Sequence, residues 1–374
     1  MAKSSALVNL PREVFSYSRA YEVLAAKNAT LRLRAASGHI FSFTDLTSAS
    51  GAVNFGHLNP GIDPFARLTS DLVASIYPPS AASYARWLLK KLKLGAHTVL
   101  YQAGAGAVVG AAIALARHAR PGKVVVLDGS LHGTANGADG AEFVRIRPGS
   151  GFDAWKNISC LLYEPIQTAA GYVPLPLPWV RGLSQAAQAA GVLVIADETH
   201  SGFYRFGKLS LAASEFLLPD IFLFGNSMTN GIYPLAAMVC PEYLHEEHAP
   251  SEDSGDDHFQ TGALGFLAAE AVAGYIDATR IDVQVAGINQ ILSHAGETLA
   301  ANPSLSAFHL AGPTLSLEVR GARAGVVAEA CRAHGVLVSA GAGSRRVRVA
   351  PPVSIQPDQL TQALKVLKKA AAAL

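Results

Sequence analysis

Two apolar runs, each followed directly by polar residues, constrain the fold of this 374-residue chain most strongly. Val192–Ala196 is wholly apolar, which suits a strand buried on both faces, and it is followed by Asp197 and Glu198. Ile221–Phe224 is a second such run and is followed by the polar, glycine-containing segment GNSMTNG. In an open parallel sheet, ligands bind beyond the carboxyl ends of the strands. We therefore expect one ligand site at the sheet edge where these two strands end.

Strand-like and helix-like segments alternate over the preceding hundred residues. Apolar runs at Thr98–Gln102, Lys123–Leu127 and Ser159–Tyr163 predict strands, and the segments Val108–Arg117 and Pro176–Ala190 predict helices. Repeated strand–helix–strand units are typical of a mostly parallel sheet with helices on both faces. The sequence therefore predicts an α/β fold.

The small-residue turn Ala103–Ala107 (AGAGA) separates a predicted strand from a predicted helix. Free backbone N–H groups at a helix N-terminus allow such a turn to bind an anion. A tight turn that binds no ligand explains the same residues equally well. His132 follows another predicted strand, and a lone loop histidine is more often structural than catalytic.

The two ends of the chain are less regular. Near the N-terminus we expect helices over Pro11–Ala26, Asp63–Ala74 and Tyr84–Leu92, with strand-like pieces such as HIFSFTDL between them. After the central region, helices and alternating apolar runs predict a separate α+β module; the helices are Leu264–Ile276, Ile281–Asn302, Ala324–His334 and Gln359–Leu374, and the strands are Thr314–Val319, Val336–Ser339 and Val347–Ala350.

Composition excludes several classes of function. A net charge of +2 gives no reason to expect nucleic acid or an anionic membrane as a partner, and no apolar run is long enough to span a bilayer. Three widely spaced cysteines make neither a disulfide framework nor a metal cluster. The acidic stretch HEEHAPSEDSGDDHF lacks the usual zinc spacing and is interpreted as a solvated loop. With no signal-peptide core at the N-terminus, the expected location is the cytoplasm.

Seven short motifs occur in an order that resembles one enzyme family. They are SGAVNFGHLNP, the AGAGA turn before an alanine-rich helix, LHG, EPIQ, ADETHSGFYRFGK, NGIYPLAAMV and VRVAPP. Together they resemble the class III (omega-type) aminotransferases of the fold-type I pyridoxal-phosphate enzymes. The resemblance implies a large cofactor-binding domain over 56–277, with a mostly parallel, seven-stranded sheet. It also implies a small domain built from 1–55 and 278–374, and a homodimer with its active site at the subunit interface.

The resemblance also assigns roles to residues around the cofactor. It places Asp197 against the pyridine nitrogen, which keeps the ring protonated as an electron sink, and His200, where the family usually has Gln, beside the phenolic oxygen. Ala105 and Gly106 fall on the turn that holds the phosphate. Arg348 falls on the arginine that binds a substrate carboxylate, a bidentate task suited to Arg.

Further positions follow from the same resemblance. Glu164 begins the family's Glu-Pro signature, and Leu131 and His132 occupy the segment beside the cofactor ring. The family takes one phosphate contact from the partner subunit, and the candidates here are His258 and Thr261.

The main departure concerns the lysine that forms the Schiff base and moves the proton. Asn226 occupies that position in Gly225-Asn226-Ser227, and an amide nitrogen is neither nucleophilic nor basic. Asn226 should therefore abolish ordinary turnover, leaving pyridoxal phosphate bound non-covalently or as an external aldimine.

Three other positions depart from the family pattern. Leu131 replaces the aromatic residue that stacks on the ring, and Gly104–Ala107 lacks the polar side chains of the family's turn. Ala169 replaces the glutamate on which the substrate-binding arginine rests, so Arg348 should have no obvious resting place.

These departures leave three interpretations of the function. The leading one is an aminotransferase-like enzyme acting on an amino acid or amine, inactivated by the change from lysine to Asn226, which would trap an external aldimine. The second is a tailoring enzyme of the same family that performs elimination, replacement or carbon–carbon bond formation on an amino acid. The third is a pseudoenzyme that keeps the pocket as a binding module.

Overall fold

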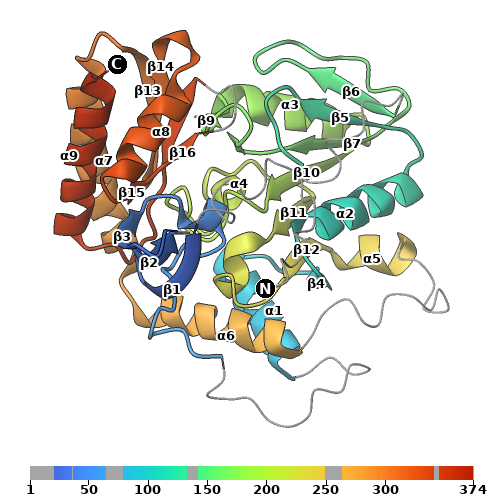
Figure 1. Cartoon of the computed structure of the whole chain (residues 1–374). Helices are drawn as coiled ribbons and strands as arrows, with labels where there is room; N and C mark the ends of the chain where they lie inside the picture. The colour runs from blue at the N-terminus through green and yellow to red at the C-terminus, as the bar shows by residue number, and fades with distance from the viewer. Residues whose placement is uncertain are drawn as a thin grey trace, which may run out of the picture.

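A seven-stranded sheet lies at the centre of the protein (Figure 1). The structure is a computed structural model that describes residues 21–35, 37–64, 79–132, 142–248, 263–340 and 345–373. The strand order is β4 (His97–Gln102), β12 (Ala236–Pro241), β11 (Ile221–Phe224), β10 (Leu193–Glu198), β7 (Ile158–Tyr163), β5 (Lys123–Leu127) and β6 (Phe143–Ile146). Only β12 runs antiparallel to its neighbours, β11 and β4, which confirms the predicted mostly parallel α/β sheet.

Helices cover both faces of this sheet. On one face lie α2 (Ala105–Ala119) and α5 (Glu242–His248); on the other lie α1 (Pro79–Leu92), α3 (Leu177–Ala189) and α6 (Ala263–Ala278). Along β10 the side chains alternate between the two cores: Ile195 packs on the α2 side, and Val194 and Ala196 pack on the α3 side. Continuing this alternation, Asp197 faces the α2 side and Glu198 faces the opposite side.

A four-stranded sheet joins the beginning of the described chain to its C-terminal part. The order is β1 (Tyr21–Lys27), β2 (Thr30–Ala35), β3 (Ile40–Asp45) and β15 (Val336–Leu337), with β15 parallel to β3. Residues from both ends therefore share one sheet, as expected for a small domain built from both termini. The exact boundaries 56–277, 1–55 and 278–374 stay a prediction.

The remaining C-terminal residues build an α+β layer. Its sheet has the order β13 (Leu305–Ala311), β14 (Thr314–Val319), β17 (Arg346–Val349) and β16 (Ser339–Ala340). Helices α7 (Ile281–Ala300), α8 (Ala324–Ala333) and α9 (Pro357–Ala372) pack beside it, at the red end of the chain in Figure 1. The short elements of the chain are β8 (Ile166–Gln167), β9 (Val173–Pro174), α4 (Leu211–Ser214), η1 (Ser48–Gly51), η4 (Asn226–Thr229) and η6 (Arg320–Ala322).

Two predicted elements are wrong. The helix expected over Pro11–Ala26 is strand β1 from Tyr21 onward, because this segment pairs antiparallel with β2, and sheet pairing outweighs its local helix propensity. The single strand expected over Val336–Ser339 divides at Val338: its first half pairs with β3 and its second with β17. Most of the helix expected over Asp63–Ala74 lies outside the described residues. Across the described ranges, no helix is long and apolar enough to cross a membrane.

Candidate active site

Asp197 is a buried, ionised carboxylate at the carboxyl end of β10. Its Oδ2 lies 2.7 Å from Nδ1 of His132, and its Oδ1 accepts hydrogen bonds from the Thr199 amide at 3.0 Å and the Thr199 hydroxyl at 2.6 Å. Burial alone would raise the pKa of Asp197, but the hydrogen bonds and charge of His132, together with Thr199, hold that pKa below its usual value. The site therefore holds a fixed negative charge in the protein interior.

Glu164 is a second buried carboxylate beside Asp197. It accepts hydrogen bonds from the amide of Leu131 at 2.7 Å and from the amide and hydroxyl of Thr168 at 3.2 and 2.7 Å. Burial raises the pKa of Glu164 to about 7, and the negative charge of Asp197 adds to that rise. Glu164 therefore fixes the backbone of Leu131, and with it the segment that carries His132.

The N-terminus of α2 faces the same edge of the sheet. Its N-cap residue, Gly104, offers no side-chain hydrogen bond, and no acidic residue occupies the first turn, so no side chain of the cap satisfies the N–H groups there. Gly104 has φ +139°, which favours glycine. The turn that contains Ala105 and Gly106 therefore has the backbone arrangement of an anion site.

Gly225 brings three strand ends together. A Cβ atom placed on Gly225 would lie 3.4 Å from the Cβ atoms of both Ala105 and Thr199. The β4–α2 turn, the end of β10 and the end of β11 therefore meet at this glycine, as the sequence predicts for one site. A larger side chain at 225 would fill the space between them.

Asn226 follows immediately and begins the short helix η4. Its backbone has φ +43°, an uncommon conformation for a residue other than glycine, although asparagine tolerates it better than most. Within residues 221–230, Asn226 alone is partly exposed, and its neighbours Gly225 and Ser227 are buried. Ser227 donates a 2.6 Å hydrogen bond to the carbonyl of Gly51, which fixes the turn against the N-terminal segment.

His200 follows Asp197 by three residues, in the turn after β10. Its Nδ1 lies 3.3 Å from the hydroxyl of Thr199. Burial lowers the pKa of His200, and the positive charges of His132, Arg205 and Arg348 add to this effect while Asp197 opposes it. His200 is therefore a neutral imidazole at neutral pH, in the electrostatic field of both Asp197 and Arg348.

Arg348 has a resting place, contrary to the expectation from Ala169. Its guanidinium carbon lies 5.3 Å from the ring centre of Tyr172, and its Nη2 donates a 3.0 Å hydrogen bond to the hydroxyl of Ser339. The expectation was wrong because it considered only an acidic partner, and a cation can also rest on an aromatic face.

Of the predicted site residues, His258 and Thr261 lie outside the described residues. The residues that sequence reasoning missed are Thr168, Thr199, Tyr172 and Ser339. Thr168 and Thr199 each follow an acidic site residue within four positions, which is a detectable signal for side-chain hydrogen bonding. Tyr172 and Ser339 approach Arg348 only through the tertiary fold.

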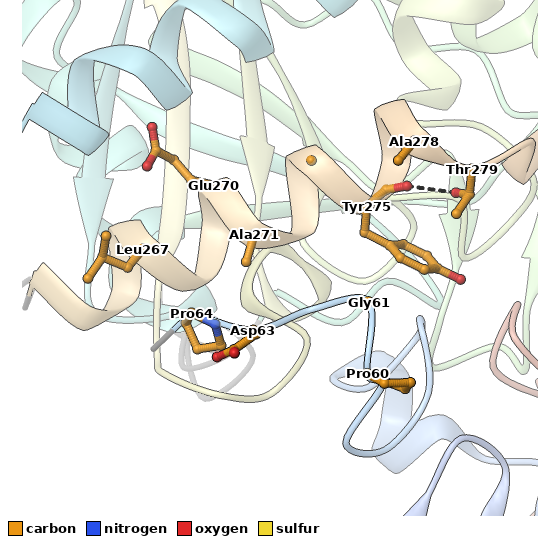
Figure 2. Close-up of a pocket in the computed structure, with 11 residues that line it drawn as sticks. Pro60, Gly61, Asp63, Pro64, Leu267, Glu270, Ala271, Tyr275, Ala278 and Thr279 are labelled. Carbon is orange, nitrogen blue, oxygen red and sulfur yellow. Dashed lines mark hydrogen bonds between the residues drawn. The ribbon is translucent and has the colours of Figure 1, made fainter. Parts of the chain in front are cut away.

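A separate groove of about 410 Å³ lies between α6 and the segment from Pro60 to Pro64 (Figure 2). Figure 2 shows the ring of Tyr275 beside this segment, and the hydroxyl of Thr279 donates a 2.7 Å hydrogen bond to the carbonyl of Tyr275. None of the predicted site residues that the structure describes lines this groove.

Comparison with known proteins agrees with the fold and the motifs. The Acetylornithine aminotransferase of Listeria innocua is 27% identical over 284 residues, covering 69% of this chain and 71% of that protein. Acetylornithine aminotransferase 1 of Bordetella parapertussis is 26% identical over 371 residues, covering 87% and 89%. Among solved structures, acetylornithine aminotransferase from Elizabethkingia anophelis matches with a TM-score of 0.81 at 22% identity, covering 95% of this chain and 94% of that one. Ornithine delta-aminotransferase of Plasmodium falciparum matches with a TM-score of 0.78 at 19% identity, covering 94% and 92%.

The family description Aminotransferase class-III matches residues 152–371, more than half of the chain. This match includes Asp197, Asn226 and Arg348 and thus most of the candidate site. The chain belongs to the class III aminotransferase family.

Proposed function

We propose that this protein binds pyridoxal phosphate at the sheet edge around Asp197 and acts on an amino acid that carries a carboxylate within reach of Arg348. The observation that carries the proposal is the ionised, buried Asp197, which shares this edge with the uncapped N-terminus of α2. Class III aminotransferases are pyridoxal-phosphate enzymes, and curated relatives are named for acetylornithine and ornithine. An amino acid of the ornithine or acetylornithine type is therefore the first substrate class to test.

The residues present fit a non-covalently held cofactor. Asp197 would hold the positive charge of the pyridine nitrogen, and the amides of Ala105 and Gly106 would hold the phosphate. Gly225 lets the turn with Ala105 and the end of β10 with Thr199 approach each other closely. When bound, pyridoxal phosphate supplies an electron sink for the substrate.

Each protein group would then have a limited task. Asp197 keeps a negative charge at the ring nitrogen, and Thr199 holds that carboxylate in place with two hydrogen bonds. Arg348 orients the substrate through its carboxylate. Neutral His200, beside Thr199, offers a proton acceptor at a ring nitrogen.

Asn226 does not fit covalent attachment. Its amide nitrogen has no basic lone pair, so it neither attacks an aldehyde nor accepts a proton at neutral pH. We therefore propose that the chain as it stands holds the cofactor reversibly and does not turn over by a lysine-dependent route.

The test is to introduce the missing amine. Asn226→Lys is incubated with pyridoxal phosphate, reduced with borohydride and digested, and the modified peptide is identified by mass spectrometry. We expect a reduced cofactor adduct at position 226, whereas the matched variant Asn226→Gln should show none there. Adducts confined to other lysines would contradict the proposal.

A second candidate function is that of a binding module, which keeps the pocket but does not catalyse a reaction. Asn226 itself supports this candidate. The same variant discriminates between the two. If Asn226→Lys forms the adduct and transfers an amino group from ornithine or acetylornithine, the enzyme interpretation holds. An adduct without turnover of any amino acid would favour the binding module.

We also propose that the protein is a homodimer with the site at the subunit interface, which family membership supports. Light scattering coupled to size-exclusion chromatography gives the mass directly. A monomer that binds pyridoxal phosphate with full affinity would contradict this proposal.

A further inference from the structure

Arg348 rests on an aromatic face and not on an acid. Its guanidinium carbon lies 5.3 Å from the ring centre of Tyr172, and one of its N–H groups donates to Ser339. A guanidinium has five N–H donors in its plane, and stacking on a ring uses none of them. In the part of the chain that the structure describes, no carboxylate pairs with Arg348. Most of its donors therefore stay available to a ligand.

The backbone holds Tyr172 against Arg348 through its neighbour, Gly171. Arg346 and Arg348 lie two residues apart on β17, so their side chains share one face of that strand. A Cβ atom on Gly171 would lie 2.3 Å from Cδ of Arg346, so only glycine allows this close approach. The loop before β9 is thereby packed onto β17, which places the next residue, Tyr172, beside Arg348.

Tyr172 itself adopts an unfavourable backbone conformation. Its φ is +65°, which is uncommon for a bulky residue, and such conformations persist where the surrounding structure fixes them. The amide of Tyr172 donates to the carbonyl of Gln167 at 3.0 Å, and its ring packs edge-to-face on Phe206 with the ring centres 5.1 Å apart. The ring is therefore held rigidly where the guanidinium lies.

Ser339 fixes the other side of the guanidinium. In the register of β16 and β17, Ser339 lies directly opposite Arg348, so the hydroxyl reaches the side chain from a neighbouring strand. Two neutral groups from different parts of the chain thus hold one cation. The loop that carries Tyr172 also contains Ala169, an exposed methyl where no acid competes.

We propose that Tyr172 is a positioning residue that pre-organises Arg348 for a ligand carboxylate. This inference rests on the proposed function, because it assumes that Arg348 binds a carboxylate. Because the guanidinium gives up no acidic partner when it binds, the site favours ligands that carry a carboxylate within reach of Arg348. A ligand without that carboxylate gains nothing from Tyr172.

The test measures binding of glutarate to the protein loaded with pyridoxal phosphate, by isothermal titration calorimetry. Immobilising a rotamer-rich side chain before binding is worth a factor of about 2 to 10 in affinity. We expect Tyr172→Leu to weaken glutarate binding by that factor, and Tyr172→Phe, which keeps the ring face, to bind like the wild type. Binding of glutaramide, the neutral isostere, should be the same in all three proteins.

Two outcomes would overturn the proposal. Equal glutarate affinity of Tyr172→Leu and the wild type would show that the ring does not pre-organise Arg348. A loss in Tyr172→Phe as large as in Tyr172→Leu would assign the effect to the hydroxyl. A failure of the proposed function itself gives a different result. If Arg348 does not bind a carboxylate, Arg348→Gln will bind glutarate as tightly as the wild type.

A second variant keeps the test decisive if Tyr172→Leu does not fold. Ala169→Glu adds an acid to the same loop at an exposed position, where a change of fold is not expected. We expect this acid to compete for Arg348 and weaken glutarate binding relative to the matched control Ala169→Gln. Equal affinity of the two variants would contradict a freely available guanidinium.

Discussion

Nδ1 of His132 lies 2.7 Å from Oδ2 of Asp197, and the two side chains are only 3% and 1% exposed. An isolated carboxylate this deeply buried would be forced towards its neutral form. His132 reverses that tendency by a hydrogen bond and by its charge, so Asp197 keeps a lowered pKa. This pair keeps the Asp197 carboxylate ionised at the sheet edge.

Replacing Asp197 by asparagine should weaken cofactor binding. Hydrogen bonds to charged groups contribute about 1.5–3 kcal/mol, so we expect the dissociation constant for pyridoxal phosphate to rise by about 10- to 100-fold. Fluorescence titration measures this constant. The control is Asp153→Asn, which makes the same charge change at an exposed position. Equal affinities for the two variants would argue against the role of Asp197.

Replacing His132 by asparagine should move cofactor release to higher pH. Asp197 has a depressed pKa, so the interactions of its ionised form are present above its unfolded-state pKa and are lost as the pH falls through its folded-state pKa. Without the charge of His132, that folded-state pKa rises and release begins at a higher pH. Equilibrium dialysis over a descending pH series measures the midpoint. The exposed His39→Asn is the control, and an identical midpoint in both variants would refute the prediction.

Glu198 should make the protein less stable as the pH rises. Burial raises its pKa to about 7, although Ser210, Leu211 and Ala212 donate hydrogen bonds to it. For a carboxyl with a raised folded-state pKa, the contribution is fully present below the unfolded-state value of about 4.3 and is lost as the pH rises towards 7. The loss is up to roughly 3 kcal/mol.

Urea unfolding near pH 5 and pH 8 tests the effect of Glu198. We expect Glu198→Gln to lose less stability over this interval than the wild type, because the amide does not ionise. Glu164 also has a raised pKa of about 7, and its contribution remains in both proteins. If the stability of the wild type and of Glu198→Gln depended on pH in the same way, Glu198 would not be the source of this pH dependence.

Gly312→Ala should be more destabilising than Gly321→Ala. Both glycines have positive φ, +53° and +72°, so each substitution introduces backbone strain of order 1 kcal/mol. A Cβ atom on Gly312 would also lie 2.3 Å from the carbonyl oxygen of Phe206, whereas on Gly321 the nearest atom is the Arg323 side chain at 3.6 Å. We expect an additional loss of about 1–3 kcal/mol for Gly312→Ala, measured by urea unfolding. Equal losses would show that the contact relaxes without cost.

The central sheet and most of the candidate site could be predicted because their signals are local. A strand buried on both faces is wholly apolar, so Val192–Ala196 and Ile221–Phe224 can be recognised as strands from the sequence. The polar residues directly after them lie at the edge of the sheet where ligands bind. β12 and β13 were not identified: β12 is placed by its pairing with β11 and the distant strand β4, and β13 by its hairpin with β14.

By itself, the sequence determined the α/β alternation, the acids at the end of β10 and the presence of Asn226 after β11. The tertiary structure alone decided that residues 21–27 pair as a strand, that Val338 divides two sheets and that Arg348 rests on Tyr172. The physical reason is that each depends on a partner: β1 on its hairpin with β2, and the division at Val338 and the position of Arg348 on residues far away in the chain. His132 and Asp197 are 65 residues apart, and only the fold brings an imidazole to the carboxylate whose charge it preserves.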